Sequence, residues 1–370
     1  MRIKRSIPLL ALAATVVAGM LATSSGSAVA GVSLTGQGST LVQPLVQDVF
    51  APGFQAKYGD SVTYGGTGSG AGITAISGNT VDFGASDAPL TSAQEASCSG
   101  CIEIPWALAA TGLDYNLSGV AHLNLTGAVI ANIFLGKVTN WDDPSITALN
   151  KGETLPNEKI TPVYRSDGSG DTYVFTSFLS KESPTWASQV GAATSVSFPA
   201  GTGAHGNSGV ASVVASTPGA IGNNSWFYIR QAGLKAVAIA NGAGNYIYPY
   251  EPNLVYAADL LKKVPSLSTL SSTTATTIAG DLSLVAPSYS KPKKGAKPTA
   301  LQKEEAQAYP LATFTYAIVR PDDKNVSTLK QFLAFAISPA EQKQGIGGTL
   351  QFAPLPPAVV KADTSAINGL

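Results

Sequence analysis

The sequence is poor in charge of either sign. Only 12% of its 370 residues are Asp, Glu, Lys or Arg, about half the usual share of a globular protein. The 23 basic residues equal the 23 acidic ones, so no basic excess exists to displace counterions from a nucleic acid. Binding to nucleic acid is therefore excluded as a function.

Long apolar runs are lacking after the first 30 residues, since no later stretch approaches the roughly 20 residues of a membrane helix. The N-terminus has three basic residues, an apolar stretch at 7–21 and an Ala-Val-Ala cleavage site at 28–30. These features predict a signal peptide over residues 1–30 and a mature chain from Gly31. No cysteine for lipid attachment follows the apolar stretch. We expect an exported protein, periplasmic or extracellular, that is not lipid-anchored.

Cysteine and histidine are nearly absent. The only cysteines are Cys98 and Cys101, in a Cys-Ser-Gly-Cys motif, and the only histidines are His122 and His205. In a reducing compartment this motif is typical of redox chemistry or of half a zinc site, but the second cysteine pair of a zinc site is missing. In an oxidising compartment the same spacing predicts a disulfide that pins a loop. The export signal favours the disulfide, and we predict no metal and no cofactor.

Glycine and apolar residues are abundant, with 38 Gly and 44% hydrophobic residues. A chain of this length buries one large core or two medium ones, and two domains are expected. Short apolar segments alternate with segments of helical spacing, which indicates an α/β fold. The expected strands lie at 62–64, 81–83, 160–164 and 314–319. The expected helices lie at 41–54, 73–76, 130–134, 174–179 and 326–337.

Three glycine-rich loops share one plan, in which small residues stand at the start of an expected helix. They are Gly36-Gln-Gly-Ser-Thr40, Gly66-Thr-Gly-Ser-Gly70 and Asp167-Gly-Ser-Gly170. Free N–H groups and the positive end of the helix dipole favour an anion there, glycine lets it approach the backbone, and a hydroxyl adds a donor. Ordinary helix capping explains any one of these loops. Three together favour an anion site.

Two charged residues lie just past expected strands, beside these loops. Arg165 follows the strand at 160–164, at the end of a strand where α/β sheets bind ligands. Its guanidinium can hold two oxygens of a tetrahedral anion, and the alternative is a surface salt bridge. Asp87 follows the strand at 81–83 and should repel an anion, unless that anion carries a proton for it to accept. Phosphate carries a proton near neutral pH and sulfate does not, so a proton-accepting Asp87 indicates a site for phosphate. The alternative is that Asp87 only caps the following turn.

Further motifs give the chain a resemblance to a known family. They are the string Asn79-Thr-Val-Asp-Phe-Gly-Ala-Ser-Asp-Ala-Pro-Leu90 and segments at 133–141, 217–222 and 353–357. With the three loops they span nearly the whole mature chain, which resembles the substrate-binding proteins of phosphate-specific ABC transporters. The resemblance implies a two-lobed periplasmic-binding-protein fold, type II-like, with a hinge and a ligand cleft between the lobes. It implies high-affinity binding of inorganic phosphate, delivery to the permease subunits in the membrane, and no enzymatic activity.

The resemblance also implies a division of the chain into lobes. Lobe one is expected to comprise residues 31–112 plus 309–370, and lobe two residues 113–308. The second lobe includes a Ser/Thr-rich and Lys/Pro-rich segment at about 266–305, whose composition is typical of a surface excursion or mobile loop. We expect a monomer.

By motif, the expected phosphate ligands are backbone, hydroxyl, carboxylate and guanidinium groups of one set of residues. The set is Ser39, Thr40, Leu41, Ser69, Asp87, Arg165, Ser169, Gly170 and Asp171. Asp171 departs from the family, because many members have Thr there. We expect its N–H to donate and its carboxylate to turn away, with Thr172 as a substitute hydroxyl. Asn223 and Asn224 replace a commoner aromatic residue, and the sequence offers no interpretation of them.

Two other functions compete with phosphate transport. A secreted phosphatase or other hydrolase would use one of the many serines, but no Gly-x-Ser-x-Gly elbow occurs. His205 lies in a glycine-rich loop that is typical of an exposed histidine. A binding protein for another oxyanion, such as sulfate, molybdate or tungstate, is opposed by Asp87.

Overall fold

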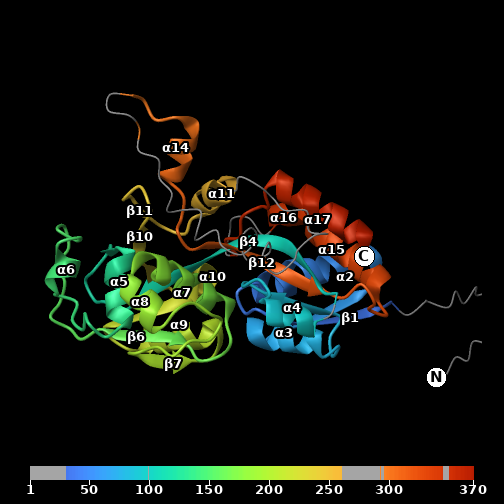
Figure 1. The fold of residues 1–370 in the computed structure, drawn as a ribbon, viewed down its shortest axis with the longest axis horizontal. Coiled ribbons are helices and arrows are strands. Elements are labelled where there is room, and N and C mark those ends of the chain that lie inside the picture. Colours follow the sequence, from blue (N-terminus) through green and yellow to red (C-terminus); the bar gives the residue numbers. More distant parts are fainter. Residues whose placement is uncertain (1–30, 99, 261–291, 293–295, 345–349) are drawn as a thin grey trace, which may run out of the picture. The chain divides into compact units, whose positions relative to one another are not determined.

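Strands and helices alternate along the chain in a computed structural model that describes residues 31–98, 100–260, 292, 296–344 and 350–370. The predicted signal peptide and most of the Ser/Thr-rich and Lys/Pro-rich segment lie outside the described residues. Residues 32–370 group as one compact unit. The predicted α/β class is confirmed (Figure 1).

One large sheet contains most of the strands. They are β1 (Ser33–Gly38), β2 (Ser61–Gly66), β3 (Phe83–Ser86), β4 (Ile102–Tyr115), β6 (Thr161–Arg165), β7 (Thr202–Ala204), β8 (Ala220–Ser225), β9 (Lys235–Ala236) and β12 (Ala312–Val319). Their order is β2-β1-β3-β12-β4-β8-β6-β7, with β9 paired to β4. A second sheet consists of β5 (Asn124–Leu125), β10 (Ala238–Ala240) and β11 (Tyr246–Ile247).

The helices flank the strands in two groups. The first group comprises α1 (Gln43–Leu45), the π-helical turn η1 (Val46–Phe50), α2 (Ala51–Tyr58), α3 (Ser69–Ser77), α4 (Ser92–Ser97), α15 (Val326–Ala336), α16 (Pro339–Gln344) and α17 (Pro357–Gly369). The second group comprises α5 (Gly127–Phe134), α6 (Pro144–Thr147), α7 (Gly170–Glu182), α8 (Pro184–Gln189), α9 (Gly206–Ser216), α10 (Trp226–Gln231), α11 (Glu251–Asp259) and α14 (Ala300–Glu305). Helix α3 contacts β1 and α9 contacts β6, and Figure 1 draws each of these helices with its strand.

The direction of the strands decides where the ligand loops meet. β1, β2 and β3 are mutually parallel, and β6, β7 and β8 form a second parallel set. β4 runs through both sets, because its first half pairs with β12 and its second half pairs with β8. β12 is antiparallel to both β3 and β4, while β8 is antiparallel to β4. The carboxyl ends of the two sets therefore point toward each other along β4.

Both predicted crossings between lobes fall close together in this sheet. The boundary at 112/113 lies inside β4, and the boundary at 308/309 lies just before β12. β12 brings the C-terminal segment beside β3, although more than 200 residues separate them in the sequence. The division into lobes stays a prediction.

Two expected elements differ from the structure in detail. The helix expected over residues 41–54 is divided into α1, η1 and α2. Pro52 has no N–H to donate to the carbonyl four residues earlier, and the helix widens into a π turn just before it. The strand expected at 81–83 begins only at Phe83, since the Asp82 carboxylate accepts hydrogen bonds from the Thr35 N–H at 2.6 Å and its hydroxyl at 2.8 Å.

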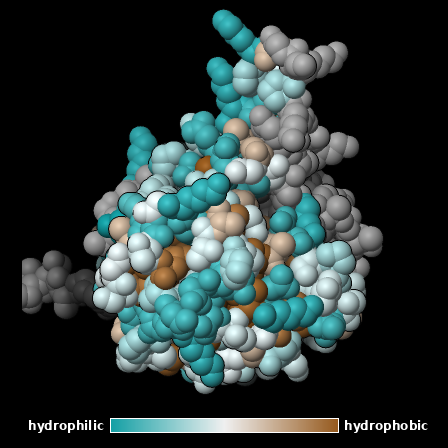
Figure 2. Space-filling model, turned by 90° about the vertical axis from the view of Figure 1, so that its left-hand side faces the viewer, coloured by the Kyte–Doolittle hydropathy of each residue, from teal (hydrophilic) through white to brown (hydrophobic). Residues whose placement is uncertain are grey.

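The core beside β1–β3 is aromatic. Phe83, Trp106 and Phe332 are fully buried and lie with ring centroids 5.6 to 6.4 Å apart, within the range of favourable aromatic pairs. Phe332 belongs to α15, whose buried residues recur at helical spacing. Among the described residues, only Tyr58, Tyr250 and Leu301 are large hydrophobic side chains that are exposed. The face shown in Figure 2 is mostly hydrophilic, with small separated hydrophobic areas.

Candidate functional site

The first loop joins β1 to α1 and places Ser39 at the centre of the site. Gly38 has φ +145°, and a Cβ there would lie 2.0 Å from the Ala85 carbonyl oxygen, so only glycine fits. The buried Ser39 hydroxyl donates to Asp87 Oδ2 at 2.5 Å and accepts from the Leu41 N–H at 3.0 Å. One hydroxyl therefore binds the backbone of the turn that leads into α1 and also holds the Asp87 carboxylate.

The second and third loops contact each other directly. The Gly70 N–H donates to the Gly168 carbonyl at 2.9 Å, and the Gly170 N–H donates to the Ser69 hydroxyl at 3.0 Å. Gly170 also lies against Asp87, because a Cβ on Gly170 would be 2.5 Å from the Asp87 Cβ. These contacts join the carboxyl ends of the two parallel sets.

Arg165 ends β6 and is buried, so the alternative of a surface salt bridge is wrong. Its Nε donates to Asp167 Oδ1 at 2.8 Å, and its Nη2 pairs with Asp167 Oδ2. Its Nη1 donates to Asp171 Oδ2 at 3.0 Å. Asp167 is held in turn by the Gly206 N–H at 3.0 Å. The guanidinium is thereby fixed in position with two N–H bonds left for other acceptors.

Asp87 is a buried carboxylate that is only partly satisfied. Its Oδ2 accepts from Ser39 and, at 3.5 Å, from the Ser69 hydroxyl, whereas its Oδ1 is buried without a hydrogen-bond partner. Burial and, next, the charge of Asp171 raise the pKa of Asp87. An unpaired buried acceptor is costly, and a protonated ligand oxygen is the kind of group that satisfies it.

The Asp171 carboxylate does not turn away from the site, and that expectation is wrong. Its Oδ2 accepts from Arg165 and, at 2.8 Å, from Asn207 Nδ2. The cation and the amide hold it inside the cluster, where only 1% of the residue is exposed. Its Oδ1 and the neighbouring Thr172 hydroxyl are both buried without partners. Burial raises the pKa of Asp171 despite the opposing charge of Arg165.

Asn207 was not anticipated from the sequence, yet it joins three parts of the site. It is fully buried near the start of α9, and its Nδ2 donates to Thr40 Oγ1 and to Asp171 Oδ2, both at 2.8 Å. Its Oδ1 accepts from the Ser225 N–H at 2.9 Å. The glycine-rich sequence before Asn207 predicts only a loop.

The structure places all of the predicted ligand residues at this meeting point and buries them. Ser169 caps α7 through its hydroxyl, which accepts from the Thr172 N–H at 3.4 Å. The structure also gives Asn223 and Asn224 a role. Their side-chain amides donate to Thr111 Oγ1 and Asp114 Oδ2, both at 3.1 Å, and so link β8 to β4. Their role is to support the sheet behind the site.

The other candidate groups lie elsewhere. Cys98 and Cys101 form a disulfide, as predicted. His122 and His205 are both exposed, and within the described ranges no group of three or more His, Cys, Asp or Glu side chains could hold a metal. In the same part of the chain, no helix is long and apolar enough to cross a membrane.

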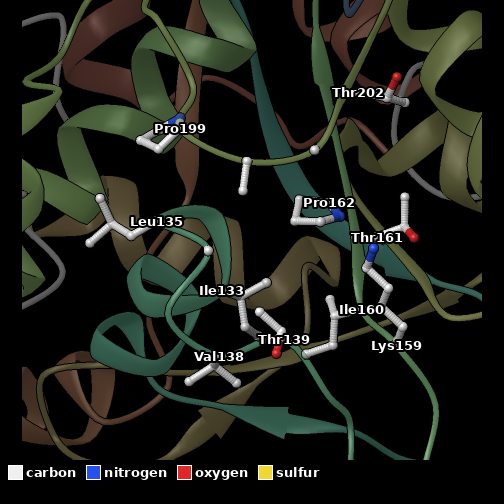
Figure 3. Close-up of a pocket in the computed structure, with 13 residues that line it drawn as sticks. Ile133, Leu135, Val138, Thr139, Lys159, Ile160, Thr161, Pro162, Pro199 and Thr202 are labelled. Atoms are coloured by element: carbon white, nitrogen blue, oxygen red, sulfur yellow. The ribbon is translucent and has the colours of Figure 1, made fainter.

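A pocket of about 490 Å³ lies at the opposite end of β6 from Arg165. Figure 3 shows aliphatic side chains around it, among them Ile133, Leu135, Ile160 and Pro162. Lys159 is its one charged lining residue. The pocket therefore lacks the converging donors of an anion site, and the cluster around Arg165 remains the candidate.

The fold and the cluster together define a class of protein: an α/β binding protein that holds an anion between two facing sets of strand ends. The PBP superfamily domain matches residues 23–340. The phosphate-binding protein PstS of Xylella fastidiosa is 33% identical over 332 residues, which cover 89% of this chain and 83% of that protein. PstS of Haemophilus influenzae is 31% identical over 330 residues, covering 89% and 90%. The chain belongs to the PstS family of phosphate-binding proteins.

Solved structures share the fold. A putative phosphate ABC transporter substrate-binding protein from Clostridium perfringens, with bound phosphate, has 17% identity and a TM-score of 0.60, covering 88% of this chain and 100% of that one. A phosphate-binding protein from Stenotrophomonas maltophilia has 18% identity and a TM-score of 0.63, covering 90% and 94%. The predicted periplasmic-binding-protein fold is confirmed.

Proposed function

We propose that this protein binds inorganic phosphate outside the cytoplasm and delivers it to the permease of an ABC transporter. The observation that carries the proposal is the pairing of a fixed, buried guanidinium with a buried carboxylate that still has one free acceptor, Asp87 Oδ1. A cation attracts the anion, and an acceptor selects one that carries a proton. The names of the PstS relatives support the same ligand.

The proposed ligand contacts follow from the geometry. The first and third loops present backbone N–H groups near Ser39 and Gly170, at the starts of α1 and α7, where the helix dipoles favour an anion. Arg165 supplies the opposite charge through its two uncommitted N–H bonds. The protein acts by binding and release, and no catalytic residue is assigned.

Calorimetric titration of the mature protein, stripped of ligand, tests the proposal. We expect sub-millimolar binding of phosphate and much weaker binding of sulfate. Sulfate bound as tightly as phosphate would favour a binding protein for another oxyanion. Steady hydrolysis of a chromogenic phosphate ester would favour the phosphatase and contradict the proposal.

The cellular location of the protein is proposed from its sequence. The predicted signal peptide supports a binding step outside the cytoplasm, in the periplasm or at the cell surface. We propose that the protein acts as a monomer.

A further inference from the structure

The ligand cluster contains two carboxylates with the same unusual property. Asp87 and Asp171 are each 1% exposed, and each has one oxygen held by neighbours and one buried oxygen without a hydrogen-bond partner. Asp87 follows β3 and Asp171 lies in the first turn of α7, so the two approach from opposite parallel sets. An unpaired buried acceptor costs about 1 to 3 kcal/mol. A hydrogen-bond donor at either oxygen would therefore stabilise the bound state.

The charge balance favours a ligand that brings protons into the cluster. Arg165 is the single cation of the cluster, and it already pairs with Asp167 and Asp171. Together with Asp87, three carboxyl groups share one guanidinium in a buried environment, where charges are poorly screened. A dianion would add two more negative charges to this excess, and a monoanion adds only one.

The remaining groups around the carboxylates do not supply the missing protons. Asp87 is faced by Ser39, Ser69, Thr315 and Tyr64, and Asp171 by Asn207, Thr111 and Tyr228. Against the effect of burial, the hydroxyls of Thr315 and Thr111 lower the pKa of Asp87 and Asp171, but among the described residues no donor lies within hydrogen-bond distance of either Oδ1. Burial raises the pKa of Tyr64, and burial with the charge of Asp171 raises the pKa of Tyr228 to about 12. Both tyrosines therefore keep their protons throughout the neutral and mildly alkaline range.

We infer that Asp171 is a second proton acceptor for the ligand, so that the species bound is the monoanion H₂PO₄⁻, with one P–OH on Asp87 Oδ1 and the other on Asp171 Oδ1. This inference rests on the proposed function. A relative with Thr at this position offers one carboxylate and one hydroxyl, and such a site suits the singly protonated dianion. Asp171 thereby sets which protonation state of phosphate the protein takes up.

The inference has a measurable consequence, because the complex holds two protons. Above neutral pH free phosphate is the dianion with one proton. We expect the cleft carboxylates of the free protein to be ionised between about pH 8 and pH 9, because the pKa of Asp87 is raised only to about 7, and because Arg165 and Asn207 oppose the effect of burial on the pKa of Asp171. Binding must then take up one proton from solution. By linkage, the affinity falls about tenfold for each pH unit between about pH 8 and pH 9. A binding site with one proton acceptor takes up no proton in this pH range, so its affinity for phosphate stays constant.

The experiment is titration calorimetry with inorganic phosphate across that range, in buffers of different ionisation enthalpy so that proton uptake is counted directly. We expect uptake of about one proton by the wild type and a tenfold fall per pH unit. Asp171→Thr and Asp171→Asn should bind with nearly constant affinity and almost no uptake. Asp322→Asn, at an exposed carboxylate paired with Arg320, is the matched control and should behave as the wild type.

The possible outcomes separate this inference from the proposed function. If the wild type binds phosphate without proton uptake, or if Asp171→Thr and Asp171→Asn keep the wild-type slope, Asp171 is not a proton acceptor, although phosphate binding stands. If no phosphate binds at any pH, the proposed function itself fails. Because the readout is a slope within each variant, a general loss of affinity from the substitution does not mimic the result.

Discussion

At the scale of single residues, Arg165 is the group whose loss should affect binding most. Arg165→Ala removes the cation that pairs with Asp167 and Asp171 and leaves both carboxylates without a positive partner among the described residues. We expect phosphate binding to weaken by on the order of 2 to 5 kcal/mol, measured by calorimetry. Arg320→Ala is a matched control, because Arg320 forms the same two-bond pair with Asp322 at the surface. Wild-type affinity in Arg165→Ala would show that the anion lies elsewhere.

Asp87 should decide between phosphate and sulfate. Asp87→Asn replaces an acceptor with an amide that can donate, so a fully ionised anion is no longer repelled. We expect the affinity ratio of phosphate to sulfate to fall by roughly tenfold or more, which corresponds to about 1.4 kcal/mol. Titrations with both anions measure the ratio. An unchanged ratio would refute the role of Asp87 as proton acceptor.

Gly170 is required because it lies against Asp87. Gly170→Ala brings a methyl group within 2.5 Å of the Asp87 Cβ, and one of the two loops must shift. We expect phosphate affinity to fall by about 1 to 3 kcal/mol. Gly152→Ala, where nothing lies within 4 Å of the added methyl, serves as control. Equal affinities for both variants would mean that the Asp87–Gly170 contact is not part of the bound state.

Single residues were predictable from the sequence where a local rule applied. Arg165 and Asp87 could be placed because each follows a recognisable strand, and strand ends are where such sheets bind ligands. The position of the Asp171 carboxylate could not be predicted, because Asn207 holds it and no local pattern indicates a partner 36 residues away. Asn207 gave no signal, since its importance comes entirely from packing. Contacts between distant segments are thus the part that sequence patterns omit.

At the scale of elements, periodic segments were predicted well. The strand β12 and the helix α15 lie within a few residues of their expected limits, because both have long, regular apolar patterns. Gly136, with φ +71°, ends α5 as expected. The strands β7 and β9 have three and two residues, too few to form a pattern. They exist only because neighbouring strands supply hydrogen bonds.

The C-terminal helix α17 contains a buried acid that should reduce stability at neutral pH. Both carboxylate oxygens of Asp363 are buried without partners, and burial raises its pKa to about 9. The folded state therefore holds a proton that the unfolded state releases. Stability is highest below the unfolded pKa of about 4 and falls as the pH rises toward the folded value.

Asp363→Ala should remove this penalty. We expect the free energy of unfolding at about pH 8 to rise by on the order of 1 to 3 kcal/mol, and its decline between about pH 5 and pH 8 to become smaller. Urea unfolding at several pH values measures both. Ser365→Ala, at an exposed position of the same helix, controls for helix propensity. A lower free energy of unfolding for Asp363→Ala at pH 8 would show that the Asp363 carboxyl group stabilises the fold, contrary to this account.

At the scale of the whole molecule, the joining of the two parallel strand sets could not be read from local patterns. β4 pairs with β12 in one half and β8 in the other, so a single strand connects both sets. The motif resemblance implied a hinge, but register and strand order depend on contacts across more than 100 residues. The direct contacts between the sets in the site are hydrogen bonds such as Ser69–Gly170 and Asn207–Thr40. Water can replace these polar contacts at small net cost.

Closure should therefore depend on phosphate. The hydrogen bonds between the two sets are individually worth about 0.5 to 1.5 kcal/mol, whereas an anion held by Arg165 on one side and by the first loop on the other binds only the closed arrangement. We expect small-angle scattering to show a smaller radius of gyration when phosphate is added to the wild type, and no change when it is added to Arg165→Ala. Sulfate should leave both unchanged. An equal radius for the wild type with and without phosphate would mean that the two sets are held together by β4 and β12 alone, with the ligand entering a cleft that is already closed.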